Sequence, residues 1–456
     1  MLTYQLKKAP GIPLYEALYR CIRADILDGT LQPGQKLPSK RALAQNLEVS
    51  KITVETAYSQ LLAEGYISAR EKVGYFVEAV ERTAPKAAPM TPAAAVPDET
   101  PLLDLTGGGT EKFPFSVWSR LQREVMLDYG EKLLLHLPNK GLPELRQAIA
   151  EHLAAFRGME VDPENILIGA GTDFLYNLLI QLLGRELTYA VEEPGYGKIR
   201  KIYAAGGVRA VSAEMDSKGV TVSSLRDAQV LHISPSHHFP TGLVTPVSRR
   251  MELLSWAREG ERWIIEDDYD SEFRFDSHPK PTMQSLDGGG RVIYMNTFSK
   301  SLAPSIRISY MVLPGALMRQ FQEKLGFYSC TVPSFEQYTL ARFLSRGHFE
   351  KHINRMRKFY KSRRNRVITL LKGCAFADKL TILEQDAGLH FLVKVDTPLS
   401  DRELKDRLAG AGIRIHTLTD YYHTPDREDL HCLVVNYAGL NEDNLAAALN
   451  TLPDIF

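Results

Sequence analysis

The distribution of apolar residues near the N-terminus predicts three helices followed by two strands. The predicted helices are residues 13–27, 40–46 and 51–64, and the predicted strands are residues 66–70 and 75–77. Within the helices apolar residues recur every three or four positions, whereas the strand segments alternate. Ser39 and Ser50 stand where N-cap residues are preferred, and Gly65 ends the third helix. Three helices with a tight turn between the second and third, followed by a two-stranded wing, predict a winged helix-turn-helix domain over residues 1–78.

Residues 79–101 have no hydrophobic period and no aromatic residue. This stretch contains seven alanines and five prolines, and proline favours an extended polyproline II chain. Its 23 residues span at most about 70 Å at roughly 3.1 Å per residue. We therefore predict a linker between the N-terminal domain and a large domain of residues 102–456.

Short apolar runs alternate with helical segments after the linker. The runs that predict buried strands are residues 166–168, 188–191, 230–233, 263–265 and 292–295. This alternation is typical of an α/β layer with a mostly parallel sheet. The pattern changes from about residue 340, where a long basic helix is predicted at 349–372 and precedes strand-like residues such as 389–393. The predicted fold class is α/β, with a smaller C-terminal α+β subdomain.

Composition restricts the class of protein but not its function. Hydrophobic residues make up 44% of the 456 positions, and 55 Lys and Arg balance 55 Asp and Glu, so no overall field attracts nucleic acid or a membrane. The four cysteines form no Cys-x-x-Cys pair, which argues against a metal site or a disulfide framework and fits a reducing compartment. The N-terminus lacks the apolar segment of a signal peptide, and no apolar run approaches the roughly 20 residues that cross a bilayer. We therefore expect a cytoplasmic protein without a membrane partner.

Several polar side chains of the N-terminal domain stand where a helix-turn-helix meets DNA. In this motif the second helix of the unit enters the major groove, and its first turn faces base edges. The candidate DNA-binding residues are Arg41 on the preceding helix, Ser50, Lys51 and Thr53 in that first turn, and Lys72 and Tyr75 on the wing. Residues 1–80 carry ten Lys and Arg against eight Asp and Glu, so this prediction depends on the pattern and not on charge. A winged helix used for protein contacts is the alternative.

Residues 12–78 resemble the GntR family of bacterial regulators. The resemblance is carried by the segments 37–44 (LPSKRALA), 49–54 (VSKITV) and 57–65 (AYSQLLAEG). It implies that the domain binds a double-stranded DNA operator. Lys51 departs from the family, which more often has arginine there; lysine contacts phosphate or guanine less rigidly.

Lys300 stands in a spacing of side chains that suits pyridoxal phosphate (PLP). It ends the segment 297–300 (TFSK), Arg307 lies seven residues downstream, and an upstream apolar run leads into 267–270 (DDYD). An amine forms a Schiff base with the aldehyde of PLP, a carboxylate keeps the pyridine nitrogen protonated, and hydroxyls with a guanidinium bind the phosphate. The alternative is a surface lysine near an ordinary strand, but several independent positions agree with the first interpretation.

Residues 103–455 resemble fold-type I aminotransferases. The matching segments include 141–146 (GLPELR), 169–173 (GAGTD) and 193–196 (EPGY). The second of these follows a predicted strand and opens a helix, where backbone N–H groups and the helix dipole suit a phosphate. In the family the aromatic ring at the position of Tyr196 stacks over the pyridine ring, although this tyrosine taken alone would be assigned to the core.

The winged helix, the Pro/Ala linker and the segment 267–273 (DDYDSEF) together resemble the MocR-type branch of the GntR family over nearly the whole chain. The resemblance implies a PLP-dependent transcriptional regulator that forms a homodimer and whose Lys300 holds PLP as an internal aldimine. The other PLP-binding residues that it implies are Asp267 at the pyridine nitrogen, Tyr269 at the phenolic oxygen, Thr297, Ser299, Arg307, Gly171, Thr172 and Asp173 at the phosphate, and Tyr196 over the ring.

Two positions depart from the aminotransferase pattern. Phe239 stands where the family usually has an asparagine that bonds the phenolic oxygen of PLP, and phenylalanine cannot form that bond. Val434 stands where aminotransferases place an arginine that clamps the substrate carboxylate. Arg414 and Lys198 are the candidate substitutes for this arginine. The valine weakens the case for ordinary transamination and for an α-amino acid as effector.

The sequence leaves three hypotheses about function. The first is a regulator in which PLP or a small amine at Lys300 changes how the dimer presents its DNA-binding domains. The second is a working aminotransferase with an accessory DNA-binding domain, and the third is a regulator in which PLP is purely structural. The winged helix and the missing arginine favour the first, which is compatible with a residual transamination half-reaction. The effector is either an amine, such as a γ-amino acid, a sulfonate or a dipeptide, or PLP itself.

Overall fold

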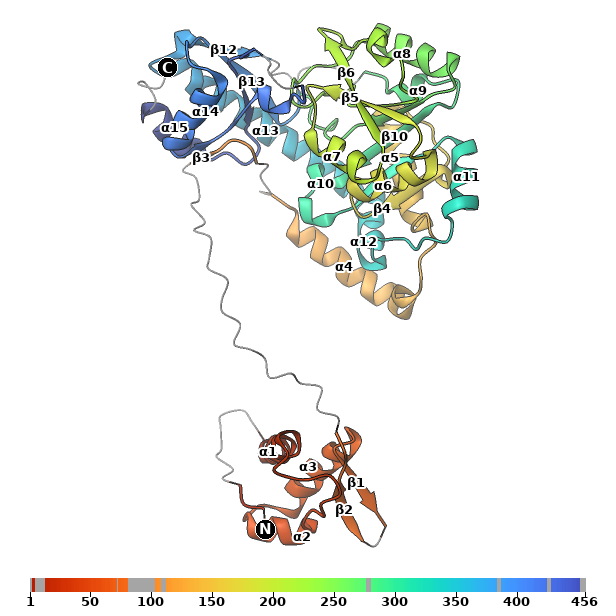
Figure 1. The fold of residues 1–456 in the computed structure, drawn as a ribbon, viewed down its shortest axis with the longest axis vertical. Coiled ribbons are helices and arrows are strands. Elements are labelled where there is room, and N and C mark those ends of the chain that lie inside the picture. The colour runs from red at the N-terminus through yellow and green to blue at the C-terminus, as the bar shows by residue number, and fades with distance from the viewer. Residues whose placement is uncertain are drawn as a thin grey trace. The chain divides into compact units, whose positions relative to one another are not determined.

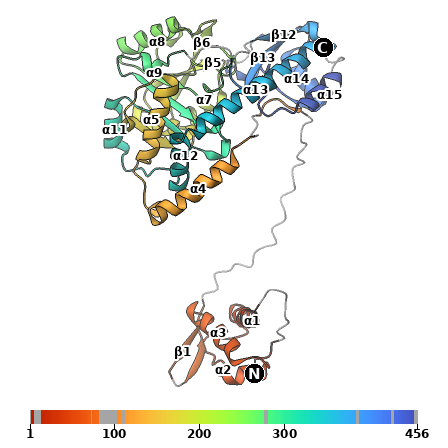
Figure 2. The ribbon, with the colours of Figure 1, turned by 180° about the vertical axis from the view of Figure 1, so that it is seen from behind.

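The computed structural model describes residues 2–4, 13–71, 73–80, 103–107, 112–275, 280–383, 387–424 and 428–451. They belong to two compact units, one within residues 1–98 and one within residues 99–456, which Figures 1 and 2 show from opposite sides. Lys72 and residues 81–101 of the predicted linker lie outside the described residues. None of the described helices is long and apolar enough to cross a membrane.

The N-terminal unit is a winged helix-turn-helix, as the hydrophobic pattern predicts. Its elements are α1 (Leu14–Asp28), α2 (Lys40–Asn46), α3 (Lys51–Ala63), β1 (Ile67–Arg70) and β2 (Gly74–Val77). Ser39 Oγ accepts a hydrogen bond from Ala42 N at 3.2 Å, and Ser50 Oγ accepts one from Thr53 N at 3.1 Å, so both predicted N-caps are formed. One apolar core joins the three helices to the wing, and its fully buried members are Leu18, Ile22, Leu43, Val54, Ala57, Tyr58 and Leu61.

The second unit is built on an eight-stranded sheet in the order β4-β11-β10-β9-β8-β5-β6-β7. The strands are β4 (Ile166–Gly169), β5 (Thr188–Glu193), β6 (Arg209–Asp216), β7 (Gly219–Val220), β8 (Val230–Ile233), β9 (Trp263–Asp267), β10 (Val292–Thr297) and β11 (Ser309–Val312). The central pairs β10–β9, β9–β8, β8–β5 and β5–β6 are parallel. The pairs β4–β11, β11–β10 and β6–β7 are antiparallel, so β11 and β7 run opposite to the other six strands of this sheet. This topology confirms the predicted mostly parallel α/β sheet.

Both faces of this sheet are covered by helices. In β4, Ile166 and Ile168 face one apolar cluster, whereas Leu167 faces another. The first cluster includes residues of α5 (Pro143–Arg157) and α12 (Ser334–Ser345), and the second includes residues of α6 (Thr172–Leu183) and α11 (Gly315–Leu325). Helix α7 (Gly197–Ala205) follows β5 in the chain, and helix α8 (Val247–Glu259) precedes β9. Burial on both faces explains why the strands read as continuous apolar runs in the sequence.

The long basic helix α13 (His348–Gly373) runs from the large sheet to a smaller C-terminal subdomain (Figure 2). That subdomain has a four-stranded sheet in the order β12-β13-β16-β15, with pairs that are all antiparallel. Its elements are β12 (Leu380–Leu383), β13 (His390–Val395), α14 (Asp401–Gly410), β14 (Ile413–Arg414), β15 (His416–Thr417), β16 (Cys432–Asn436) and α15 (Glu442–Thr451). The predicted α+β subdomain is therefore present.

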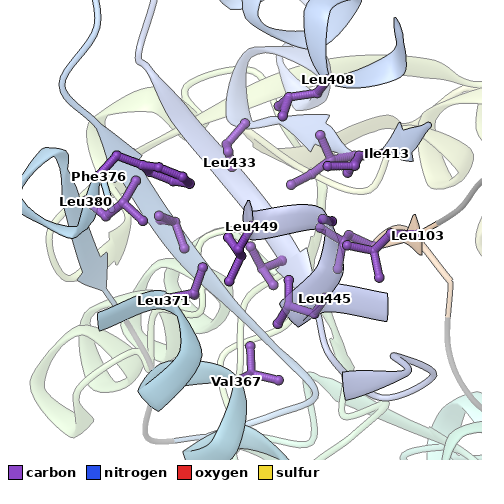
Figure 3. A pocket seen from close by; sticks show the side chains of 15 residues that line it. Leu103, Val367, Leu371, Phe376, Leu380, Leu408, Ile413, Leu433, Leu445 and Leu449 are labelled. Atoms are coloured by element: carbon purple, nitrogen blue, oxygen red, sulfur yellow. The ribbon is translucent and has the colours of Figure 1, made fainter. Parts of the chain in front are cut away.

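A strand that the sequence did not reveal joins this subdomain from the start of the second unit. β3 (Leu103–Asp104) pairs in parallel with β14, more than 300 residues later in the chain. Leu103 and Leu105 line an apolar cavity of about 50 Å³ at the centre of the subdomain. Figure 3 shows Leu103 beside Ile413 on one wall of that cavity, with Leu371 and Phe376 on the opposite side. The first described residues after the predicted linker therefore belong to the C-terminal subdomain.

Candidate cofactor and DNA-binding sites

The carboxyl end of β9 places Asp267 among buried aromatic and imidazole side chains. Asp267 Oδ2 accepts a hydrogen bond from the hydroxyl of Tyr176 on α6 and lies 3.5 Å from His232 Nε2 on β8. Burial raises the pKa of Tyr176 well above its ordinary value, so the phenol keeps its proton and is the donor. The other carboxylate oxygen, Oδ1, is buried and has no hydrogen-bond partner among the described residues. Because buried polar atoms are rarely unsatisfied, this oxygen is open to a donor on a ligand.

The turn after β4 meets the segment after β10. Gly171 caps α6 with φ of 91°, and a Cβ at this position would lie 2.2 Å from a guanidinium nitrogen of Arg307. Arg307 has a left-handed backbone (φ of 52°), donates to Ala170 O at 3.2 Å and lies 3.6 Å from Asp173 Oδ2. The first turn of α6, which begins at Thr172, thus combines free N–H groups with a neighbouring guanidinium, an arrangement that suits a phosphate.

Two hydroxyls lie at the junction of β10 and the short helix α10 (Phe298–Ser301). Thr297 Oγ1 accepts hydrogen bonds from Ser299 N at 3.1 Å and from Ser309 Oγ at 2.8 Å, so it shapes the turn. Ser299 Oγ is buried and has no hydrogen-bond partner among the described residues. Ser301 Oγ, on a residue that lines the same pocket as Ser299, is likewise buried without a hydrogen-bond partner among the described residues.

Lys300 is exposed and lines a pocket between the large sheet and the C-terminal subdomain. The pocket is lined by Phe239, Tyr269, Asp270, Ser299, Lys300, Ser301, Leu302, Pro304, Met356, Tyr360, Leu389, His390, Asn436 and Ala438. His237 Nδ1 lies 2.8 Å from Asp270 Oδ2 and 3.4 Å from the hydroxyl of Tyr269. Burial raises the pKa of Tyr269 well above its ordinary value, so its phenol can donate a hydrogen bond. The structure therefore brings Lys300, Tyr269 and Ser299 to one pocket.

Phe239 and Val434, the two departures from the aminotransferase pattern, lie in one apolar cluster with Leu392, Cys432, Leu418, Tyr421 and Leu430. The ring of Phe239 meets Tyr421 and His390 edge-on, each with centroids 5.0 Å apart. It also meets Tyr196, which is half exposed, at 5.9 Å. The valine side chain is therefore surrounded by apolar groups, and the position contributes no cation.

Neither candidate substitute for the missing arginine lines the Lys300 pocket. Lys198 Nζ pairs with Asp173 Oδ2 at 2.7 Å, and Arg414 pairs with Asp104 Oδ2 at 3.3 Å. Both cations are engaged elsewhere, so the structure gives no support to either of them as a carboxylate clamp.

Asp268 is not among the described residues that line this pocket and is instead half of a buried ion pair. Its Oδ2 lies 2.7 Å from Arg157 at the end of α5, and the two side chains are 0% and 7% exposed. The hydroxyl of Tyr294 also donates to Asp268 at 2.7 Å. Burial alone would raise the pKa of Asp268, but the Arg157 charge and the Tyr294 hydrogen bond hold it below its ordinary value. Asp268 therefore ties the end of β9 to α5.

In the N-terminal unit, the first turn of α3 exposes Lys51 and Ile52, whereas Thr53 is half-buried and Val54 is buried. Ser50 Oγ and Thr53 Oγ1 lie 2.8 Å apart and satisfy each other, whereas Lys51 projects into solvent. Arg41 on α2 is also exposed. The ring of Tyr75 packs edge-on against Tyr58 with centroids 5.0 Å apart and is therefore part of the link between wing and core.

Comparison with known proteins agrees with both halves of this description. Residues 14–77 match the family of gntR bacterial regulatory proteins, and residues 104–452 match the aminotransferase class I and II family. The HTH-type transcriptional regulator YdeL of Bacillus subtilis is 36% identical over 99% of this chain and 98% of its own. The probable rhizopine catabolism regulatory protein MocR of Rhizobium meliloti is 33% identical over 99% of this chain and 95% of its own. The chain belongs to the MocR-type branch of the GntR family.

The large domain of this MocR-type regulator has the fold of a PLP enzyme. The kynurenine aminotransferase of Pyrococcus horikoshii, solved with the amino form of the cofactor, is 25% identical with a TM-score of 0.69, covering 78% of this chain and 90% of its own. PLP is the cofactor of such a domain. The residues of this MocR-type protein fit it, because Asp267 Oδ1 and Ser299 Oγ are unsatisfied and Gly171 leaves space at Arg307.

Some residues around the site were not predicted from the sequence. Tyr176 lies one helical turn after Thr172, a spacing that would have marked it as facing the same side of α6. His232 and His390 sit in buried strands, where a histidine is most simply assigned to the core. Nothing in the linear sequence links Arg157 to Asp268, which is more than 100 residues away.

Proposed function

We propose that this MocR-type protein is a transcriptional regulator that binds operator DNA through residues 1–78 and senses PLP or a small amine at Lys300. The observation that carries the proposal is that buried polar atoms are left without a partner among the described residues, namely Ser299 Oγ in the Lys300 pocket and Asp267 Oδ1 two residues before Tyr269 of that pocket. The same chain contains a winged helix whose α3 begins with exposed residues. A bacterial regulator of this kind acts in the cytoplasm, where it meets its operator.

Each polar group of the site has one role in holding PLP. Asp267 accepts a hydrogen bond from the protonated pyridine nitrogen and keeps it protonated, Tyr269 donates to the phenolic oxygen, and Tyr196 covers the ring. The phosphate is held by Thr297, Ser299, Arg307, Gly171, Thr172 and Asp173, where Asp173 orients the cations and the others donate. The cofactor supplies an aldehyde that condenses reversibly with amines, while the hydrogen bond from Tyr176 keeps Asp267 in place.

The DNA-binding residues are Arg41, Ser50, Lys51, Thr53, Lys72 and Tyr75, which divide into two groups. Lys51 reaches base edges or phosphates from the major groove, and Arg41 with Lys72 contacts the backbone. Ser50 and Thr53 order the start of α3 through their mutual hydrogen bond, and Tyr75 fixes the wing. Residues 79–101 form the linker to the PLP domain of residues 102–456.

The protein acts as a homodimer in which a second copy covers an apolar surface of the PLP domain. Large hydrophobic residues are exposed on and after α4 (Phe115–Tyr129) and next to α11. They are Phe115, Met126, Leu127, Leu134, Leu135 and Phe327, five of them at least 68% exposed. Such a set of exposed apolar side chains is typical of a protein interface.

The effector is an amine that does not need a carboxylate clamp, or PLP itself. Among the described residues that line the pocket, Lys300 is the only lysine or arginine. The neighbouring His390 stays neutral, because burial and the adjacent His237 bring its pKa well below the ordinary value. A carboxylate placed here would be desolvated beside Asp270, and among the described lining residues only Lys300, the proposed site of the aldimine, could carry a positive charge.

The C-terminal subdomain connects this pocket to the linker. Asn436 lines the pocket, and its backbone N–H donates to Leu105 O at 3.0 Å. Leu105 lies in the segment that follows the linker in the chain, and β3 of this segment is paired with β14. A movement of the subdomain when the pocket is filled therefore moves the attachment point of the DNA-binding domain.

The proposal is tested by titrating the PLP-loaded full-length protein with matched amines, such as leucine and 3-methylbutylamine, which differ only by the carboxylate. The absorbance of the bound cofactor, the formation of keto acid and the affinity for a selected operator are followed together. We expect the carboxylate-free amine to change both absorbance and DNA affinity without release of 3-methylbutanal, the aldehyde that its transamination would give, and we expect leucine to give no keto acid. Steady production of keto acid would instead identify an aminotransferase with an accessory DNA-binding domain.

Lys300→Ala separates sensing from a structural role of PLP. We expect this variant to bind DNA but to lose its response to PLP and to amines. An unchanged response would show that the lysine is not the sensor.

A further inference from the structure

Ile52, in the first turn of α3, has no structural role that the fold explains. Its side chain is 73% exposed, which exceeds every other large hydrophobic side chain among the described residues of the N-terminal unit. Val54, two residues later, is fully buried and supplies the core contact of this turn. Isoleucine also forms helices less readily than lysine, glutamine or alanine, so helix stability does not favour it here. An exposed isoleucine at this position is therefore available for contact with a partner.

The exposed face of α3 contains Ile52, Glu55, Thr56 and Ser59, which recur at helical spacing. Two of the polar side chains on this face already have partners within the protein. Glu55 pairs with Lys40 at 2.7 Å, and the hydroxyl of Thr56 donates to the carbonyl of Ile52 at 2.9 Å. Ile52 therefore offers a free apolar surface at the N-terminal end of α3, the end that faces the bases in the major groove. Side chains of a helix point toward its N-terminus, so the side chain of Ile52 is directed toward this end.

The major groove of DNA presents one apolar group on its base edges, the 5-methyl group of thymine. We propose that Ile52 is a specificity-determining residue that reads a thymine methyl group in each operator half-site. The proposal rests on the proposed DNA-binding function. The branched side chain is held in essentially one rotamer in a helix, so little conformational freedom is lost when it packs against a base.

The size of the effect follows from the area of one methyl group. Burial of a single methyl or methylene group contributes about 0.8 kcal/mol, which corresponds to a roughly four-fold change in dissociation constant. For a dimer on two equivalent half-sites, removal of both thymine methyl groups is expected to weaken binding about 16-fold.

The experiment replaces thymine by deoxyuridine, which lacks only the methyl group. Binding sites are first selected from random DNA with the full-length, PLP-loaded protein, and each thymine of the selected site is then replaced in turn. Dissociation constants are measured by fluorescence anisotropy at one fixed salt concentration for the wild type and for Ile52→Ala. We expect one thymine per half-site at which deoxyuridine weakens the wild type about four-fold and leaves the affinity of Ile52→Ala unchanged.

Leu62→Ala is the matched control, because Leu62 is an exposed apolar residue near the other end of the same helix. It should retain the full deoxyuridine effect, and both variants should keep the thermal stability of the wild type. If no thymine shows a penalty that depends on Ile52, the assignment is wrong even though the protein binds DNA. If selection yields no preferred sequence at all, the DNA-binding proposal fails together with it.

Discussion

The buried pair between Asp268 and Arg157 allows a quantitative test of how the segment 267–273 is held. In Asp268→Asn the Arg157 guanidinium would remain buried without its counterion. The two groups are 2.7 Å apart and almost fully buried, and removal of one partner from such a pair costs about 3–5 kcal/mol. The cost should appear in the PLP domain, because both residues lie there.

This loss converts into a change of melting temperature. A domain of roughly 350 residues has an unfolding entropy of about 0.7 kcal/mol per kelvin, so the variant should melt about 4–7 °C below the wild type. The folded-state pKa of Asp268 lies below its ordinary value, so the stabilisation is present at neutral pH and is lost as the pH falls through that lowered pKa. The comparison is therefore made at pH 7 by differential scanning calorimetry of the protein without added ligand.

A matched control comes from an exposed ion pair of the same domain. Glu261 lies 3.6 Å from Arg291 with 84% of its side chain exposed, so Glu261→Gln should shift melting by no more than about 1 °C. The double variant Arg157→Met/Asp268→Asn should recover part of the loss, because it removes the unpaired cation. A melting temperature for Asp268→Asn within 1 °C of the wild type would refute the argument.

Three further predictions address the cofactor site and the C-terminal subdomain. Asp267→Asn removes the negative charge of the carboxylate whose Oδ1 atom has no partner among the described residues. We expect this variant to bind PLP about 10- to 100-fold more weakly in a fluorescence titration. Gly171→Ala places a Cβ 2.2 Å from the Arg307 guanidinium at a φ of 91°, which should weaken PLP binding on the order of ten-fold; Gly158→Ala, with a positive φ but open space, should leave it intact. Leu103→Ala enlarges an apolar cavity and should destabilise the PLP domain by about 2–5 kcal/mol in urea unfolding, and an unchanged midpoint would show that β3 does not anchor there.

Signals within short segments of the sequence determined where the helices and strands lie. Ser39 and Ser50 are N-caps where the sequence predicts them, because an N-cap needs only a hydroxyl and the backbone N–H three residues later. The strands of the large sheet could be found because burial on both faces requires continuous apolar runs. Lys300, Ser299 and Tyr269 could be assigned to one pocket because their spacing resembles a known family, and the structure brings them together.

Contacts between distant segments were decided only by the tertiary structure. No local signal joins Arg157 to Asp268 or β3 to β14, since these pairs depend on how the strands are ordered in space. No local signal joins Phe239 to Val434 either. In the sequence they are two separate departures from the aminotransferase pattern, but in the structure they lie in one apolar cluster. Exposure is also a tertiary property: Ile52 and Val54 are both apolar members of one helical turn, and only packing decides that one is buried and the other is free to meet DNA.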